Sequence, residues 1–121
     1  MQQQSLDTIA HARSGDKGNH ANVAVFAYTP IGYDWLRDNL TAEAVQRYFA
    51  PLHPSRVVRY EAPNVRALNF VLYDVLAGGA SRSLRIDSQG KTLALALLQM
   101  PVDLTDEQAE SMRRPKARHL P

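Results

Sequence analysis

Apolar and polar residues alternate in two segments near the start of the chain. The first segment runs from Leu6 to Arg13, and the second runs from Asn22 to Tyr28. Because successive side chains of a strand point to opposite faces of a sheet, both segments are predicted to be strands. Residues 14–20 between them are all glycine or polar, so we expect a loop there. A connection of this length favours antiparallel neighbours.

Two helix starts follow the second predicted strand. Thr29 stands before a proline, and Thr41 stands before an apolar stripe at helical spacing, so each threonine is a candidate N-cap. The first helix should extend to about Leu40. Pro51 and Pro54 should end the second helix, because proline cannot continue the hydrogen-bond ladder.

The middle of the chain carries one strand pattern and one helix pattern. Residues 56–61 alternate as a strand does, so we predict a third strand there. Apolar residues recur at helical spacing within residues 64–77, which predicts a helix that stops at Gly78-Gly79. The apolar stripe of this helix consists of Val65, Leu68, Leu72 and Leu76.

Several short elements are predicted in the last third of the chain. We expect a strand over residues 83–87, a short helix over residues 93–98 and an edge strand over residues 102–104. Thr105 and Gln108 have the spacing of a capping box, which starts a helical turn. The order of elements predicts an α+β fold, in which helices pack on one face of an antiparallel sheet.

Length and composition support one folded domain. A chain of 121 residues with 45% hydrophobic and 21% charged residues is ordinary for a globular protein with a single core. We expect residues 5–104 to form this domain and residues 105–121 to add a helical turn and a basic tail. The sequence has no cysteine, which excludes disulfides and thiolate metal sites.

The sequence offers no signal for secretion, membrane insertion or nucleic-acid binding. The first residues contain no basic segment followed by an apolar one, and no apolar run reaches the length of a bilayer span. We therefore expect a cytoplasmic protein without a membrane partner. The net charge is only +2, and the basic residues near the end are not interleaved with aromatic residues, so no nucleic-acid partner is expected.

The densest group of polar residues lies in the predicted loop. From Arg13 to Asn19 the chain offers two cations, a carboxylate, a hydroxyl, a carboxamide and two glycines. The glycines let the backbone turn and expose N–H groups, while Arg13 and Lys17 supply positive charge for a phosphate or carboxylate. The alternative is an ordinary connection, because turns also require these residue types. Spacing alone leaves both interpretations open.

Asn69 interrupts the apolar stripe of the predicted 64–77 helix. A buried carboxamide without partners is unfavourable, so Asn69 either bonds to the backbone of the loop or binds a ligand in a pocket. Arg82 is a further candidate cation beside the loop, with an ordinary strand edge as the alternative.

Histidine chemistry is disfavoured. The four histidines are scattered, and no pair has metal-ligand spacing, so neither a metal nor a cofactor is expected. His11 or His20 is a candidate base for Ser14 or Asp16, but a lone histidine near a strand end is more often exposed or structurally bonded.

The polar segment and several later segments resemble the AtuA-like module of the acyclic terpene utilisation proteins. The most specific match is Ala12 to Asn19 followed by Ala21 to Val23. The further matches are residues 60–64, 67–70, 78–79, 81–85 and 87–91. The resemblance implies a ferredoxin-like α+β fold, found either at the C-terminus of a larger protein or as a separate small chain encoded beside one.

The resemblance also implies a partner and a substrate class. The family is associated with the catabolism of branched, terpene-derived acids that are handled as coenzyme A thioesters. We therefore expect a small subunit or accessory domain that completes an active site on a larger AtuA-type protein. In this hypothesis Arg13, Lys17 and Arg82 bind a small anionic acyl or carboxylate substrate.

The alternative is a self-contained enzyme that acts on an acyl thioester or carboxylate. Asp16 would then be the acid/base, and the site would require Asp16 and Asn69 on one side of the domain. The candidate residues are Asp16 and Ser14 for catalysis, and Arg13, Lys17, Asn19, Asn22, Asn69 and Arg82 for substrate binding. In isolation we expect a homodimer, because a small sheet with an uncovered face or edge tends to find a partner.

Overall fold

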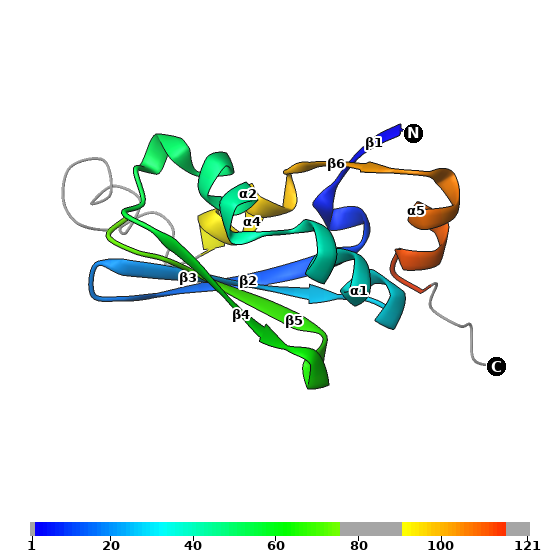
Figure 1. Ribbon diagram of the computed structural model, residues 1–121, viewed down its shortest axis with the longest axis horizontal. Helices are drawn as coiled ribbons and strands as arrows, with labels where there is room; N and C mark the ends of the chain where they lie inside the picture. Colours follow the sequence, from blue (N-terminus) through cyan, green and yellow to red (C-terminus); the bar gives the residue numbers. More distant parts are fainter. Residues whose placement is uncertain (1, 76–90, 116–121) are drawn as a thin grey trace.

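The computed structural model describes residues 2–75 and 91–115, and these residues form two layers (Figure 1). The lower layer is a four-stranded antiparallel sheet with the strand order β2-β3-β5-β4. Its strands are β2 (Ala10–Lys17), β3 (His20–Ala27), β4 (Val57–Ala62) and β5 (Ala67–Leu72).

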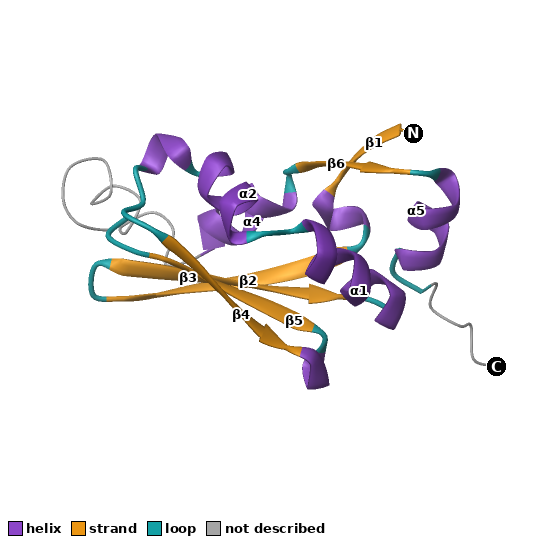
Figure 2. Cartoon of the chain, in the orientation of Figure 1, coloured by secondary structure: helices purple, strands orange, loops and turns teal. Residues whose placement is uncertain are grey.

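The helices form the upper layer on one face of this sheet (Figure 2). They are α1 (Pro30–Asn39), α2 (Ala42–Tyr48), α4 (Lys91–Leu98) and α5 (Asp106–Met112). A short two-stranded ribbon, β1 (Gln2–Ser5) with β6 (Pro101–Leu104), runs over the top of the helix layer. The predicted α+β fold with helices on one face of an antiparallel sheet is confirmed.

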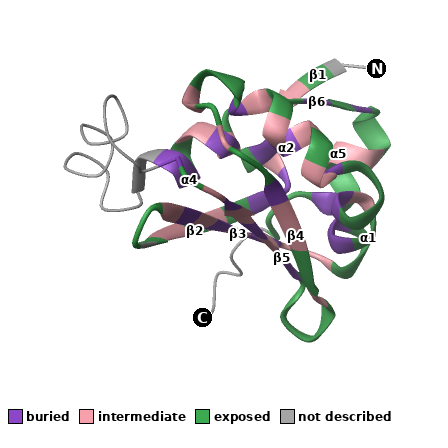
Figure 3. Ribbon diagram, turned by 60° about the vertical axis from the view of Figure 1, so that its left-hand side comes forward, coloured by how far each residue is buried: buried purple, intermediate pink, exposed green. Residues whose placement is uncertain are grey.

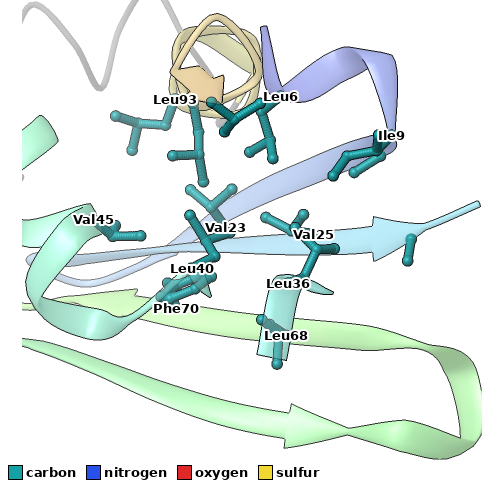
Figure 4. Packing of buried hydrophobic residues seen from close by; sticks show 14 of the residues in the cluster. Leu6, Ile9, Val23, Val25, Leu36, Leu40, Val45, Leu68, Phe70 and Leu93 are labelled. Atoms are coloured by element: carbon teal, nitrogen blue, oxygen red, sulfur yellow. The ribbon is translucent and has the colours of Figure 1, made fainter. Parts of the chain in front are cut away.

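The core lies between the sheet and the helices. In β3 every second residue from Ala21 is buried, and the residues between them are half-buried, so only one face of the sheet is covered. Leu68 and Phe70 of β5 are fully buried beside β3 and meet Leu36 of α1 and Val45 of α2 (Figure 4). The uncovered face, called here the open face, therefore carries the other half of the strand side chains.

Local signals set the helix starts as expected. The hydroxyl oxygen of Thr29 accepts a bond of 2.9 Å from the N–H of Gly32, and Thr41 does the same for Ala44 at 3.1 Å. Thr105 begins α5 with a complete capping box, in which the Gln108 side chain also accepts from the Thr105 N–H. The predicted short helix over residues 93–98 and the edge strand over residues 102–104 are also confirmed.

The predicted helix over residues 64–77 is wrong. Residues 63–65 form a short 3-10 turn, η3 (Pro63–Val65), and Arg66 then adopts a left-handed conformation with φ of 56°. β5 follows, with β3 on one side and β4 on the other. The same residues also alternate with period two, and backbone bonds to two neighbouring strands favour the strand over the helix.

The predicted loop over residues 14–20 is also wrong. β2 continues to Lys17, β3 begins at His20, and only Gly18 and Asn19 form the turn between them. Gly18 has φ of 63°, which suits a glycine in a tight hairpin. The polar residues of β2 before Lys17 are partly or fully exposed, but they do not end the strand, because backbone pairing with β3 continues through them.

The first strand begins later than predicted. Leu6 to Thr8 form a 3-10 turn, η1, and β2 starts only at Ala10. Another such turn, η2 (Ala50–Leu52), follows α2 and contains Pro51. The predicted strand over residues 83–87 and the tail from residue 116 lie outside the described residues.

Candidate functional site

The strand register gathers polar residues on the open face. Arg13 of β2 lies opposite Ala24 of β3, and Ala24 lies opposite Asn69 of β5. Directly opposed residues of antiparallel strands project to the same side, so these three form a row across the open face. Gly15 and Asn22 form the next row, nearer the hairpin. The small Ala24 leaves a gap between the long side chain of Arg13 and the carboxamide of Asn69.

Asn22 and Asn69 form a side-chain pair at the centre of this face. Asn22 Nδ2 donates to Asn69 Oδ1 at 3.1 Å, and both side chains are half-buried. Gly15 gives the pair its room, because a Cβ added there would come within 3.2 Å of the Asn22 Oδ1. No described residue accepts from Asn69 Nδ2, so this group offers two N–H donors.

A hollow of about 390 Å³ lies beside the asparagine pair. The half-buried Val71 and Tyr73 contribute apolar surface to it. The residues that line the hollow are His20, Ala21, Asn22, Asn69, Val71 and Tyr73. Apolar walls with a few polar groups are typical of small-molecule sites.

His20 presents one N–H donor at the rim of the hollow. Its Nδ1 accepts a bond of 3.0 Å from the backbone N–H of Asp74, which leaves Nε2 to donate. The same Nδ1 is 3.7 Å from the Asp74 carboxylate. The imidazole packs on Tyr73 with ring centroids 4.7 Å apart.

Arg13 places a positive charge on the open face of β2. Among the described residues, the guanidinium of Arg13 makes no hydrogen bond or ion pair. His11, two residues earlier, stacks on Phe26 with centroids 5.0 Å apart. Burial lowers the pKa of His11, and the charges of Arg13 and Arg114 lower this pKa further. Burial is thus the main cause of the lowered pKa of His11, and the two arginines add to it.

The structure separates the predicted catalytic pair from most of the predicted binding residues. Asp16 lies opposite Ala21, which lies opposite the buried Leu72, so Asp16 belongs to the helix-facing side of the sheet, while Asn69 lies on the open face. The expectation that Asp16 and Asn69 share one side is therefore wrong. Successive residues of a strand point to opposite faces of the sheet. The sequence predicted a loop here, so it did not predict to which face Asp16 points.

Ser14 has a structural partner. Its hydroxyl oxygen accepts a bond of 3.2 Å from the N–H of Ala94 in α4, on the helix-facing side. Asn19 lies exposed in the hairpin turn, and the backbone of Lys17 pairs with His20 at the end of β2. Arg82 lies outside the described residues. The roles assigned to these residues stay predictions.

Sequence reasoning did not identify the contacts around His20. Ser55 Oγ donates to Asp74 Oδ2 at 2.5 Å, and the guanidinium of Arg56 lies 4.2 Å from the centre of the Tyr73 ring. This group connects the start of β4, the end of β5 and the hairpin. Its members are far apart in sequence, and the left-handed backbone of Asp74, with φ of 66°, leaves no distinctive sequence signal.

The described residues contain neither a metal-binding cluster nor a membrane-spanning helix. No three histidine or acidic side chains lie close enough together to hold a metal ion within residues 2–75 and 91–115. No helix in the same ranges combines the length and apolar character needed to cross a membrane.

The fold and this open face define an α+β domain of the ferredoxin-like class, with helices on one face of its sheet and the hollow beside the asparagine pair on the other. The chain belongs to the AtuA ferredoxin-like domain family, which it matches over residues 4–103. The resemblance noted from the sequence is thereby confirmed, together with the ferredoxin-like fold. No curated protein and no solved structure matches the chain.

Proposed function

We propose that this domain is an accessory or small subunit of an AtuA-type protein that binds an anionic acyl or carboxylate ligand on its open face. The observation that carries the proposal is the Asn22–Asn69 pair, whose free donors lie beside a hollow and in the row of Arg13. These donors match the acceptors of a carboxylate or thioester carbonyl.

The residues of this face would each make a different interaction with the ligand. The guanidinium of Arg13 would hold the negative group by charge-assisted bonds, across the gap above Ala24. The carboxamide of Asn69 would orient it, and Val71 would contact the apolar part of the ligand. Lys17 remains a second candidate cation at the end of the same strand.

A non-catalytic role is favoured over the self-contained enzyme. Ser14 is bonded to the backbone of α4, and Asp16 lies on the other side of the sheet from the hollow. Because neither predicted catalytic residue lies beside the hollow, this face would bind and position the ligand, and a larger AtuA-type partner would supply the reacting groups. Half-buried apolar residues such as Phe26 and Val71 on the same face suit contact with such a partner.

Calorimetric titration tests the proposal with inorganic phosphate, coenzyme A and isovalerate as probes. We expect at least one of them to bind the wild type, and Arg13→Ala and Asn69→Leu each to weaken binding by about tenfold or more. Arg47→Ala, which removes an exposed cation from α2, should leave binding unchanged.

Thermal melting gives the results that would contradict the proposed anion site. If no probe raises the melting temperature of the wild type, and Arg13→Ala itself lowers that temperature, Arg13 and its neighbours support the architecture and bind no anion. If Arg47→Ala weakens binding as much as Arg13→Ala does, the attraction is general and the open face is not the site.

A further inference from the structure

The four-stranded sheet has two edge strands, β2 and β4, and neither has a further strand beside it among the described residues. β4 pairs with β5 on one side, and no strand of the described chain lies beyond it. The pairing of Val57 to Ala62 with β5 is continuous, without a bulge, and β4 contains no proline. Natural sheets protect exposed edges with bulges, prolines, covering segments or inward-pointing charges. Within the described residues β4 has no bulge and no proline, and its two inward-pointing charges, Arg59 and Glu61, neutralise each other in an ion pair.

The exposed side chains of β4 also suit a contact. Tyr60 is 52% exposed on the open face, which is high for a large aromatic side chain. The end of the strand and the turn that follows are exposed as well (Figure 3). Beside the start of the strand lies a hollow of about 380 Å³, formed by the first residues of α2 together with Val57, Val58 and Arg59.

The charges of β4 are arranged symmetrically around Tyr60. Arg59 precedes it and Glu61 follows it, and the two side chains form an ion pair of 2.9 Å within the chain. If two β4 strands pair antiparallel with Tyr60 opposite Tyr60, Arg59 of each copy lies opposite Glu61 of the other. Opposite charges in directly opposed positions stabilise a strand pair, and like charges there destabilise it.

The other edge of the sheet lacks this self-complementarity. In β2, a two-fold pairing about Gly15 places Arg13 opposite Lys17 of the second copy, and pairing about Arg13 places the two arginines opposite each other. Moreover, α4 packs against β2 and bonds to Ser14. Charge therefore favours β4 over β2 as the edge that pairs with a copy of itself.

We propose that two copies of this chain associate through β4, in an antiparallel pairing with its two-fold axis at Tyr60. The two sheets then form one continuous eight-stranded sheet with both open faces on the same side. The start of α2 leaves room for Ala62 of the second copy, which lies opposite Val58 in this register. No β4 residue lines the Asn22–Asn69 hollow, but Tyr60 lies directly opposite Asn69 in the sheet, so the proposed contact borders the hollow.

Sedimentation and cysteine cross-linking test this association. The wild type should sediment as a dimer, and Tyr60→Asp, which places two carboxylates on the axis, should raise the dissociation constant by about a hundredfold. Leu95→Asp is the matched control, because Leu95 is 62% exposed on α4 and lies outside the proposed contact. It should remain a dimer.

Cross-linking covers the case in which Tyr60→Asp does not fold. Directly opposed residues of antiparallel strands have Cα atoms about 4.5–5.5 Å apart, a distance that a disulfide spans. Because the chain has no cysteine, Tyr60→Cys should form one covalent dimer on mild oxidation, and Leu95→Cys should not. A monomeric wild type at about 100 μM, a Tyr60→Asp variant that stays dimeric, or equal cross-linking of both cysteine variants would overturn the proposal.

Discussion

At the scale of single residues, the open face depends on small side chains as much as on polar ones. Gly15 gives Asn22 space, and Ala24 separates Arg13 from Asn69. A side chain at position 15 would crowd the Asn22 carboxamide and so the asparagine pair. The proposed ligand site therefore also requires small residues that carry no functional group.

His11 should make stability depend on pH. Burial and the nearby arginine charges lower its pKa in the folded chain below the ordinary value of 6.5, so between these two pKa values the unfolded chain binds more protons. The stabilising contribution of neutral His11 is thus fully present above pH 6.5 and is lost as the pH falls through the folded pKa. We expect the melting temperature of the wild type to fall more steeply than that of His11→Gln between about pH 8 and about pH 5.

The comparison with His11→Gln isolates this one group, because both proteins keep the other three histidines. Melting curves recorded by circular dichroism across the pH series provide the measurement. Parallel pH profiles for the two proteins would show that His11 has the same pKa in the folded and unfolded chains.

At the scale of elements, Arg59 joins the edge strand to a helix end. Its Nη1 donates to the carbonyl oxygen of Arg37 at 2.8 Å and to that of Leu40 at 3.0 Å. The last carbonyls of a helix lack partners within the helix, so a cation at this place both satisfies them and complements the helix dipole. The residue therefore holds the end of α1 against β4.

Replacing Arg59 should destabilise the fold. We expect Arg59→Ala to lower the free energy of unfolding by about 1.5–3 kcal/mol, because two bonds from a charged donor to helix carbonyls are lost. Urea denaturation gives the value. Glu61→Gln removes only the exposed ion pair and should cost less than about 1 kcal/mol. Equal losses for the two variants would assign the effect to the ion pair with Glu61 and not to the cap of α1.

At the scale of the whole molecule, two phenylalanines report on the two faces of the sheet. Phe70 is fully buried between the sheet and the helices, while Phe26 is half-buried on the open face. Only the first contributes to the joint packing of both layers. Comparing the stability lost when each phenylalanine is replaced therefore shows how far the open face is covered in solution.

We expect Phe70→Ala to lower the free energy of unfolding by about 3–5 kcal/mol, because it leaves a cavity in the core. Phe26→Ala should cost less than about 2 kcal/mol, since that side chain loses only partial burial and its stacking on His11. Urea or guanidinium denaturation of both variants measures the difference. A loss for Phe26→Ala as large as that for Phe70→Ala would mean that another layer covers the open face.

The sequence by itself determined the features that depend on neighbours within one turn. Thr29, Thr41 and Thr105 begin helices because each hydroxyl reaches an N–H only three residues ahead. The sequence also indicated Arg13, Asn22 and Asn69 as candidate binding residues from their residue types and local patterns, without the strand register that places all three on the open face. These choices needed no knowledge of the folded chain.

Only the tertiary structure decided the rest. Residues 67–72 satisfy a helix period and a strand period equally, and pairing with both β3 and β4 selected the strand. The same register placed Asp16 on the face opposite Asn69. The N–H that His20 accepts is 54 residues away in the chain, and the two carbonyl partners of Arg59 are 22 and 19 residues away, so no local pattern could indicate them. Contacts between distant segments have no local signature, because they form only when the sheet brings those segments together.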